Sequence, residues 1–192
     1  VSQIIVNTQM AVYGSMALAG IGVAMKISMV TNTVSLGLAQ GVQPLFGYCI
    51  GAGNWKRYRE ILKMSLSYAV GLSIVLTGLS YWFMTELVEI FLSDSEAISY
   101  AIDFADILLS TSFLFGLFFV LLCALQAMGA GRASLIINIS RQGLIYVPAV
   151  FMLQLILGVT GLVWAQPVAD ILSLLMTVWL YRKECLQRQA VV

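Results

Sequence analysis

Five long stretches of the sequence contain no charged residue, and this spacing of charges limits the possible folds more than any other feature. The stretches cover residues 1–25, 27–55, 64–85, 107–131 and 142–169. Because a bilayer core about 30 Å thick is crossed by about 20 helical residues, each stretch is long enough to span a membrane. A charge at mid-membrane costs roughly 2.5 to 3.5 kcal/mol, so membrane insertion requires windows of this kind.

The composition indicates the same class of protein. Hydrophobic residues make up 60% of the chain and charged residues 10%, against about 25% charged residues in a soluble domain. A soluble protein with a large core is therefore disfavoured, and the net charge of +1 gives no indication of nucleic-acid binding. The chain has no histidine, and Cys49, Cys123 and Cys185 are far apart, so we expect reduced cysteines and no zinc or haem site.

Turn signals divide the chain into six predicted transmembrane helices of an all-α polytopic bundle. Gly20 and Gly22 mark one turn, and glycine-containing segments at 51–54, 129–131 and 158–161 mark others. The expected spans cover residues 1–18, 23–50, 64–83, 105–128, 134–157 and 162–181. Hydrophobic residues follow a helical register from Val1 onward with no basic leader, so we expect that the chain starts inside a helix and is part of a longer protein.

Basic and acidic residues separate between alternate connections. Bases cluster between the second and third spans, between the fourth and fifth, and after the sixth, namely Lys56, Arg57, Arg59, Lys63, Arg132, Arg182, Lys183 and Arg188. The connection between the third and fourth spans carries only acids, namely Glu86, Glu89, Asp94, Glu96 and Asp103. The positive-inside rule then predicts that the basic connections and both chain ends face the cytoplasm.

Small and polar residues form stripes along the predicted helices. On the second span they recur every three or four residues, as Thr33, Gly37, Gln40, Gly41, Pro44, Gly47 and Gly51. Gly37 and Gly41 would allow another helix to approach closely, whereas Gln40 and Gln43 suit either packing or a polar cavity. Further polar stripes occupy the first span (Gln3, Asn7), the fifth (Ser134, Asn138, Arg141, Gln142) and the sixth (Gln166, Asp170, Ser173, Thr177). Kinks are expected at Pro44, Pro148 and Pro167.

Arg141 and Asp170 are ionisable residues inside predicted spans. Intramembrane charges usually face the protein interior and find partners, and the two residues lie at similar depth in antiparallel neighbours. We therefore predict that Arg141 and Asp170 pair, either as a static structural ion pair or as one that rearranges during transport. Asp106, with Asp103 on the same face, could bind a coupling ion, although an acidic helix start is the simpler explanation.

No enzyme class is indicated, because the sequence lacks a zinc-binding helix motif, a phosphate-binding loop and paired carboxylates within adjacent spans. We therefore expect no catalytic residues, no metal and no cofactor. Interrupted helices with ordered polar stripes are typical of secondary transporters, which alternate between two openings.

Several local motifs resemble one transporter family. The segment GLAQGVQPLFGY at 37–48, followed by GAGNWKR at 51–57, closely resembles the eighth helix and following cytoplasmic loop of the MATE (multidrug and toxic compound extrusion) family. The segment ALQAMG at 124–129, ahead of Arg132, is similar to the end of that family's tenth helix. The segment ALAGIG at 17–22 resembles its turn between helices seven and eight, and the order and spacing of the motifs also match.

The resemblance implies that this chain is the C-terminal six-helix lobe of a twelve-helix antiporter in the plasma membrane, the bacterial inner membrane. Such transporters export organic cations, drugs or metabolites in exchange for sodium or protons, and their two lobes surround a central cavity. The expected partners are thus the bilayer, an N-terminal lobe and a small organic, cationic substrate. Carried onto this chain, the family arrangement makes six residues candidates for the cavity lining, namely Gln3, Asn7, Gln40, Gln43, Asn138 and Arg141.

One departure from the family pattern concerns the coupling ion. Some members hold a cation between carboxylates on the seventh helix and midway along the tenth, but the first span here has no acid and the middle of the fourth is Phe113 to Phe119. We therefore expect the coupling ion to bind in the N-terminal lobe. The alternatives are a lipid-linked oligosaccharide flippase of the same superfamily, which usually carries more arginines in its cavity, and a membrane scaffold that transports nothing.

Overall fold

The computed structural model describes residues 2–189, with side chains described from residue 4 to residue 187, and this part of the chain is helical without any strand. The elements are α1 (Ser2–Val12), α2 (Ser15–Gly51), α3 (Trp55–Trp82), α4 (Met84–Phe91), α5 (Ser95–Ser110), α6 (Phe113–Ala127), α7 (Gly131–Ile139), the π-helix η1 (Ser140–Leu144), α8 (Tyr146–Leu157) and α9 (Val159–Gln189). The predicted all-α membrane bundle is confirmed.

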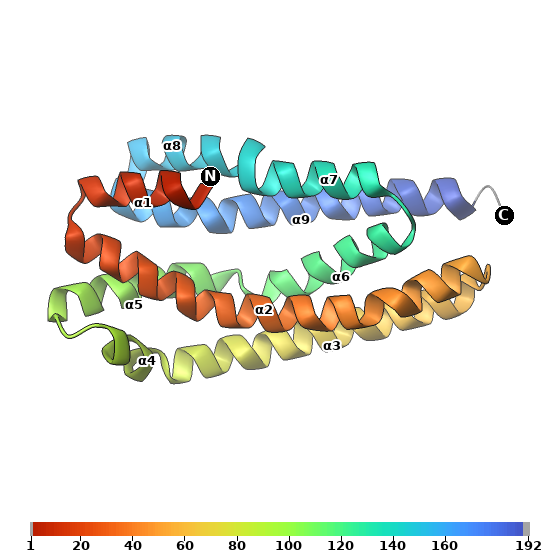
Figure 1. Ribbon diagram of the computed structural model, residues 1–192, viewed down its shortest axis with the longest axis horizontal. Coiled ribbons are helices and arrows are strands. Elements are labelled where there is room, and N and C mark those ends of the chain that lie inside the picture. Colours follow the sequence, from red (N-terminus) through yellow and green to blue (C-terminus); the bar gives the residue numbers. More distant parts are fainter. Residues whose placement is uncertain (1, 190–192) are drawn as a thin grey trace.

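The long helices run roughly along one common direction (Figure 1). Helix α2 packs against α3, α5 and α6, while α9 packs against α8, α6 and α5. Both α5 and α6 contact α2 on one side and α9 on the other, and Figure 1 shows α6 between the α2–α3 pair and α9. The interior is apolar at both ends, with one hydrophobic cluster around Phe104 and Leu109 and others around Phe46, Tyr58 and Leu125.

Four described helices are long and apolar enough to cross a membrane, and a fifth is obtained if α5 and α6 form one bent span. These four are α2, α3, the continuous segment Gly131–Leu157, and α9. The predicted first span corresponds to α1, whose 11 described residues are shorter than a bilayer crossing. The chain is thus a multi-pass membrane protein.

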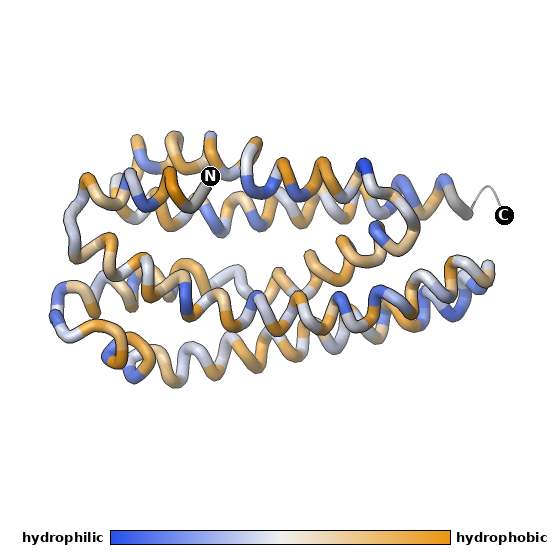
Figure 2. The backbone as a smooth tube through the Cα atoms, in the orientation of Figure 1, coloured by the Kyte–Doolittle hydropathy of each residue, from blue (hydrophilic) through white to orange (hydrophobic). Residues whose placement is uncertain are grey.

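The charge separation seen in the sequence is present in three dimensions. The loop between α2 and α3, the loop between α6 and α7 and the end of α9 lie at one end of the molecule, and the connections from α1 to α2 and from α4 to α5 lie at the other (Figure 1). Hydrophilic residues gather at both ends (Figure 2). Which end faces the cytoplasm stays a prediction of the positive-inside rule.

Three of the predicted turns are confirmed, including the one at 129–131 between α6 and α7, and one is wrong. Helix α2 ends at Gly51, where Asn54 accepts a hydrogen bond from Arg57 N–H and caps α3, and α8 ends at Gly158 with a positive φ of 62°. However, Gly20 and Gly22 lie inside α2, and the turn after α1 lies at Gly14, whose φ is 119°. Gly20 is needed for packing instead, since a Cβ there would lie 2.9 Å from Tyr100 Cβ on α5.

One other expectation is corrected. Helix α3 begins at Trp55 rather than at residue 64, so Lys56 to Lys63 lie on its first turns instead of in a loop. Among the described residues, nothing lies within 4 Å of a Cβ built on Gly37 or Gly41, so no helix of this chain approaches closely there. Helices α2 and α9 continue through Pro44 and Pro167, and the kinks expected at these prolines stay predictions.

A bend lies at Thr111 and Ser112, between α5 and α6, where the helix axes differ by 46° and no proline is present. Three consecutive hydroxyl residues explain it. Ser110 Oγ donates to the carbonyl of Ile107 and Ser112 Oγ donates to that of Leu108, and such side-chain bonds to the backbone compete with regular helix bonding. The predicted span at 105–128 is therefore two helices joined at an angle.

Helices α3 and α6 approach each other closely at Gly116 on α6. A Cβ at Gly116 would lie 2.7 Å from the backbone oxygen of Ala69 and 2.7 Å from Ser73 Oγ, both on α3. We predict that Gly116→Ala destabilises the purified protein by about 1–3 kcal/mol, because α3 and α6 must separate. Gly71→Ala on the exposed surface of α3 is the matched control, and thermal unfolding in detergent is the measurement. Equal unfolding temperatures for the two variants would contradict this packing.

Candidate functional site

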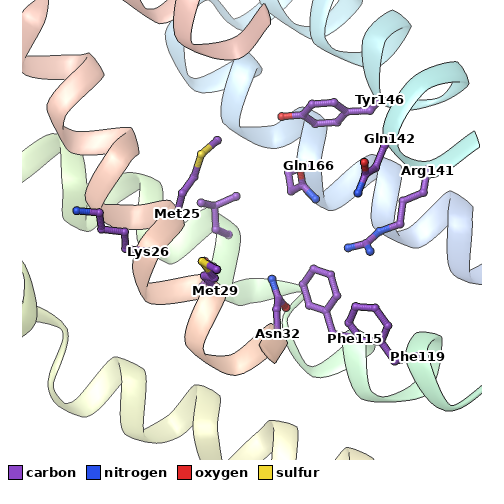
Figure 3. Close-up of a pocket in the computed structure, with 12 residues that line it drawn as sticks. Met25, Lys26, Met29, Asn32, Phe115, Phe119, Arg141, Gln142, Tyr146 and Gln166 are labelled. Atoms are coloured by element: carbon purple, nitrogen blue, oxygen red, sulfur yellow. The ribbon is translucent and has the colours of Figure 1, made fainter. Parts of the chain in front are cut away.

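A cavity of about 570 Å³ lies between the helices of the lobe and reaches its surface near the exposed residues Lys26 and Met29 (Figure 3). Its walls come from α2, α5, α6, η1, α8 and α9. The lining residues are Met25, Lys26, Ser28, Met29, Asn32, Leu108, Phe115, Phe119, Arg141, Gln142, Tyr146 and Gln166. This combination of apolar walls with a few polar groups is typical of sites for small organic molecules, whose pockets range from about 300 to 1,000 Å³.

An ion pair between Arg141 and Asp170 forms one side of this region. Arg141 Nε donates a hydrogen bond of 2.9 Å to Asp170 Oδ1, and the two side chains are only 14% and 5% exposed. Gln166 Nε2 also donates to both carboxylate oxygens of Asp170, at 3.3 and 3.2 Å. The pairing predicted from the sequence is confirmed, and the Asp170 carboxylate is satisfied by three hydrogen bonds.

Arg141 is positioned by the π-helix η1. The N–H of Ile145 donates to the carbonyl of Ser140, five residues back, at 2.8 Å. Pro148 follows in the first turn of α8; it has no N–H to donate to Leu144, and its ring crowds that carbonyl. The extra residue of the π segment relieves this clash and accommodates the missing hydrogen bond. A kink at Pro148 was predicted, and the irregular helix lies directly before it.

Aromatic rings of α6 surround the Arg141 guanidinium. Its Cζ lies 4.7 Å from the ring centroid of Phe118, 4.8 Å from that of Phe115 and 5.7 Å from that of Phe119. These distances are within the range of cation–π attraction, which strengthens where water is excluded. Figure 3 shows the guanidinium approaching the rings of Phe115 and Phe119, with Gln142 and Gln166 nearby.

Two polar groups of α2 in the cavity wall have no hydrogen-bond partner among the described residues. These are Ser28 Oγ and Asn32 Oδ1, and both atoms are buried. A buried polar atom without a partner is costly, so both groups are available to a ligand or to water within the cavity.

The residues predicted to line a central cavity between two lobes are mostly not in the wall of the cavity described above, and their place in a two-lobe cavity stays a prediction. Arg141 lines the cavity, but Asn7, Gln40 and Asn138 are exposed on the outside of the lobe. Gln43 donates to Gln126 at 3.3 Å on α6, away from the cavity. Gln3 lies in α1, but its side chain is outside the described part of the chain.

Asn138 is excluded from the cavity by a local bond, since its amide donates to the carbonyl of Ser134 on its own helix. Asp106 is exposed on α5 and does not line the cavity, so the lobe's interior does not use it. In the described part of the chain no group of three or more His, Cys, Asp or Glu side chains could hold a metal ion.

Sequence reasoning placed Gln142 and Gln166 on polar stripes but did not assign them to the cavity. It also missed Ser28, Asn32 and Tyr146. The signal available was the alignment of Ser28 and Asn32 four residues apart on the same helix face. Lys26 also lines the cavity, but it points away from Arg141 (Figure 3), and its Nζ lies 4.9 Å from the ring centroid of Phe91.

Comparison with known proteins places this architecture in a family. The MatE family model matches residues 1–152. The chain belongs to the MatE family. Over 175 residues it is 27% identical to the multidrug export protein MepA of Staphylococcus haemolyticus, covering 88% of this chain and 37% of that protein. The MepA of Staphylococcus saprophyticus is 27% identical over 185 residues, with coverage of 95% and 41%.

Solved MATE transporters share the fold. The Vibrio cholerae transporter VcmN in its bent form superposes with a TM-score of 0.88 at 18% identity, covering 98% of this chain and 43% of that one. The multidrug transporter DinF-BH, solved in complex with a ligand, gives a TM-score of 0.76 at 33% identity, covering 84% of this chain and 36% of that one. This MatE chain spans about two fifths of the length of the relatives it matches.

The ion pair of this MatE lobe generates a stability prediction for the full-length transporter. Removing one partner of a buried pair leaves an uncompensated charge, so Arg141→Gln and Asp170→Asn should each cost about 3–5 kcal/mol. The double variant should cost clearly less than the sum of the two, because neither charge then remains unpaired. Thermal unfolding of all four proteins measures this coupling.

The controls are two exposed residues, Arg132→Gln on α7 and Asp103→Asn on α5, which should change the free energy of unfolding by no more than about 0.5 kcal/mol. Additive effects of Arg141→Gln and Asp170→Asn would show that the two groups do not interact in the folded protein.

Proposed function

We propose that this chain is the C-terminal lobe of a two-lobe secondary active exporter of drugs or metabolites, driven by inward flow of sodium or protons. Membership of the MatE family and the names of the relatives, which are multidrug export proteins, support this role. The observation that carries the proposal is the cavity of about 570 Å³ between the helices of the lobe, with Arg141 of the ion pair in its wall. A membrane protein with a structural role alone has no need of such a polar interior.

The substrates are proposed to be amphipathic organic compounds, cationic ones included. Met25, Met29 and Leu108 offer adaptable apolar contacts, and Phe115 and Phe119 offer ring faces that attract cations. Ser28 and Asn32 supply polar groups without partners of their own. A site that is mostly apolar, with few directional hydrogen bonds, suits compounds of varied structure.

An N-terminal lobe is proposed to face the exposed polar stripe of α2. Gln40, Gly37 and Gly41 are all exposed in the isolated lobe. A polar surface at membrane depth is unfavourable against lipid, so this face suits a second lobe or a water-filled cavity shared with it. In this arrangement Gln3, Asn7, Gln40 and Gln43 contribute to the shared cavity and not to the cavity within the lobe.

The coupling ion is proposed to bind in the N-terminal lobe, with both chain ends cytoplasmic. In the lobe described, the buried carboxylate Asp170 is already paired with Arg141. A membrane potential of 100 mV supplies about 2.3 kcal/mol for each positive charge that moves inward, which either ion can use.

A lipid-linked oligosaccharide flippase is the second candidate. The observation in its favour is that Arg141 and Lys26 line the cavity, which has no acid among its described lining residues. An anionic pyrophosphate needs several free cationic donors, whereas Arg141 is bound to Asp170. The exporter is therefore the better supported of the two.

Drug accumulation in cells tests the proposal. Cells that express the complete two-lobe transporter should accumulate less ethidium than matched cells without it, because the compound is amphipathic and cationic. Removing sodium or collapsing the proton gradient should restore accumulation and identify the ion. Normal ethidium levels combined with a cell-envelope defect on deletion would support the flippase instead.

A further inference from the structure

The surroundings of Arg141 have the composition of a receptor for an organic cation. Phe115, Phe118 and Phe119 direct ring surfaces toward the guanidinium from α6, at 4.7 to 5.7 Å from Cζ. Asp170 supplies a carboxylate from α9, at 2.9 Å from Nε. Several aromatic faces with one carboxylate are the arrangement by which proteins recognise ammonium and guanidinium groups.

The charge balance of this region depends on a cation being present. With Arg141 in place, its charge and that of Asp170 cancel. Without Arg141, a carboxylate that is 5% exposed would keep Gln166 as its hydrogen-bond partner among the described residues. A buried, unpaired carboxylate is strongly unfavourable, so Asp170 must then take up a proton or bind another cation in place of Arg141.

The region borders the large cavity, and the side chain of Arg141 lies between the two. Arg141 and Phe115 line both that cavity and a smaller space bounded by Leu114, Phe118 and Asp170. An amphipathic cation whose apolar part lies against Met25 and Met29 could therefore extend its charged group to the rings and Asp170. Arg141 now occupies the position that this charged group would take.

The backbone that carries Arg141 provides a way to withdraw it. Residue 141 lies in the π-helix Ser140–Leu144, which holds one extra residue compared with an α-helical turn. Successive residues of an α-helix differ in direction by about 100°, so moving the extra residue along the helix would turn Arg141 away from α6. Such π segments are frequent at functional sites.

We propose that Phe115, Phe118, Phe119 and Asp170 form the binding site for the cationic group of a transported compound, and that Arg141 fills this site when no substrate is bound. This deepens the proposed function and rests on it. Arg141 therefore competes with the substrate cation for this site. It keeps Asp170 paired while the site is empty of substrate, and it yields to an organic cation during the transport cycle.

Binding of a small cation to an arginine-free variant tests this proposal. In the complete transporter, Arg141→Ala should leave the site open, and methylguanidinium should then raise the unfolding temperature with saturation. Its affinity for Arg141→Ala should be at least about tenfold higher than for the unaltered protein, where the arginine competes. Methylurea, which has a similar shape but no charge, should not stabilise the variant.

Further variants assign the binding to this site. Adding Asp170→Asn to Arg141→Ala should abolish the stabilisation, and adding Phe118→Leu should weaken it. The matched control is Phe113→Leu, since Phe113 is exposed on the same helix and does not contact Arg141 in the described structure. Arg132→Ala, which removes an exposed arginine, should not create methylguanidinium binding.

Each outcome decides the proposal. If Arg141→Ala does not fold, its recovery when the protein is produced with methylguanidinium supports the site, and failure to recover overturns it. Equal affinity of Arg141→Ala and the unaltered protein for methylguanidinium also overturns it. Because binding is measured without transport, specific binding in a protein that does not export ethidium would separate a correct site from an incorrect function.

Discussion

A buried charge in a membrane protein must have a partner, and the pair Arg141–Asp170 determines how the helices of this lobe meet. The two side chains are only 14% and 5% exposed, so water solvates them poorly, and an unpaired charge there is strongly unfavourable. Helix α9 must therefore present Asp170 to η1, and α6 must place its aromatic rings over the guanidinium. Gln166, one turn before Asp170 on α9, completes the hydrogen bonding of the carboxylate.

The cavity lies where polar side chains interrupt the apolar packing of the lobe. Apolar residues pack closely around Phe104 and Leu109 at one end and around Leu125 and Ile137 at the other. Between these clusters the walls carry Ser28, Asn32 and Gln142, and this polar zone remains hollow. The bend at Thr111 and Ser112 allows Leu108 of α5 and Phe115 of α6 to line one space from two helix directions. A hollow, partly polar interior is suited to binding molecules that leave the bilayer or the cytoplasm.

Two kinds of feature could be predicted from the sequence, namely those caused by neighbouring residues and those that the membrane imposes. The stop signals near Gly51 and Gly158 are local, and the pairing of Arg141 with Asp170 is enforced by the membrane. The turn after α1 was misplaced because Gly20 has two possible roles, and its contact with Tyr100 on α5 is not visible in the sequence. The cavity within the lobe was not predicted, because helical periodicity shows which residues share a face but not which neighbour that face meets. Asn138 is an example, because its side-chain amide donates to the carbonyl of Ser134 on its own helix.

The central claim is that the polar side of α2 faces water inside the protein while the exposed apolar faces contact lipid. In a full-length transporter without its native cysteines, modification of single cysteines by a water-soluble, membrane-impermeant thiol reagent tests it most directly. Asn32→Cys on the cavity wall should react, whereas Leu155→Cys on α8 should not, although Leu155 is 88% exposed in the lobe. Reaction at position 155 with protection at position 32 would contradict this account.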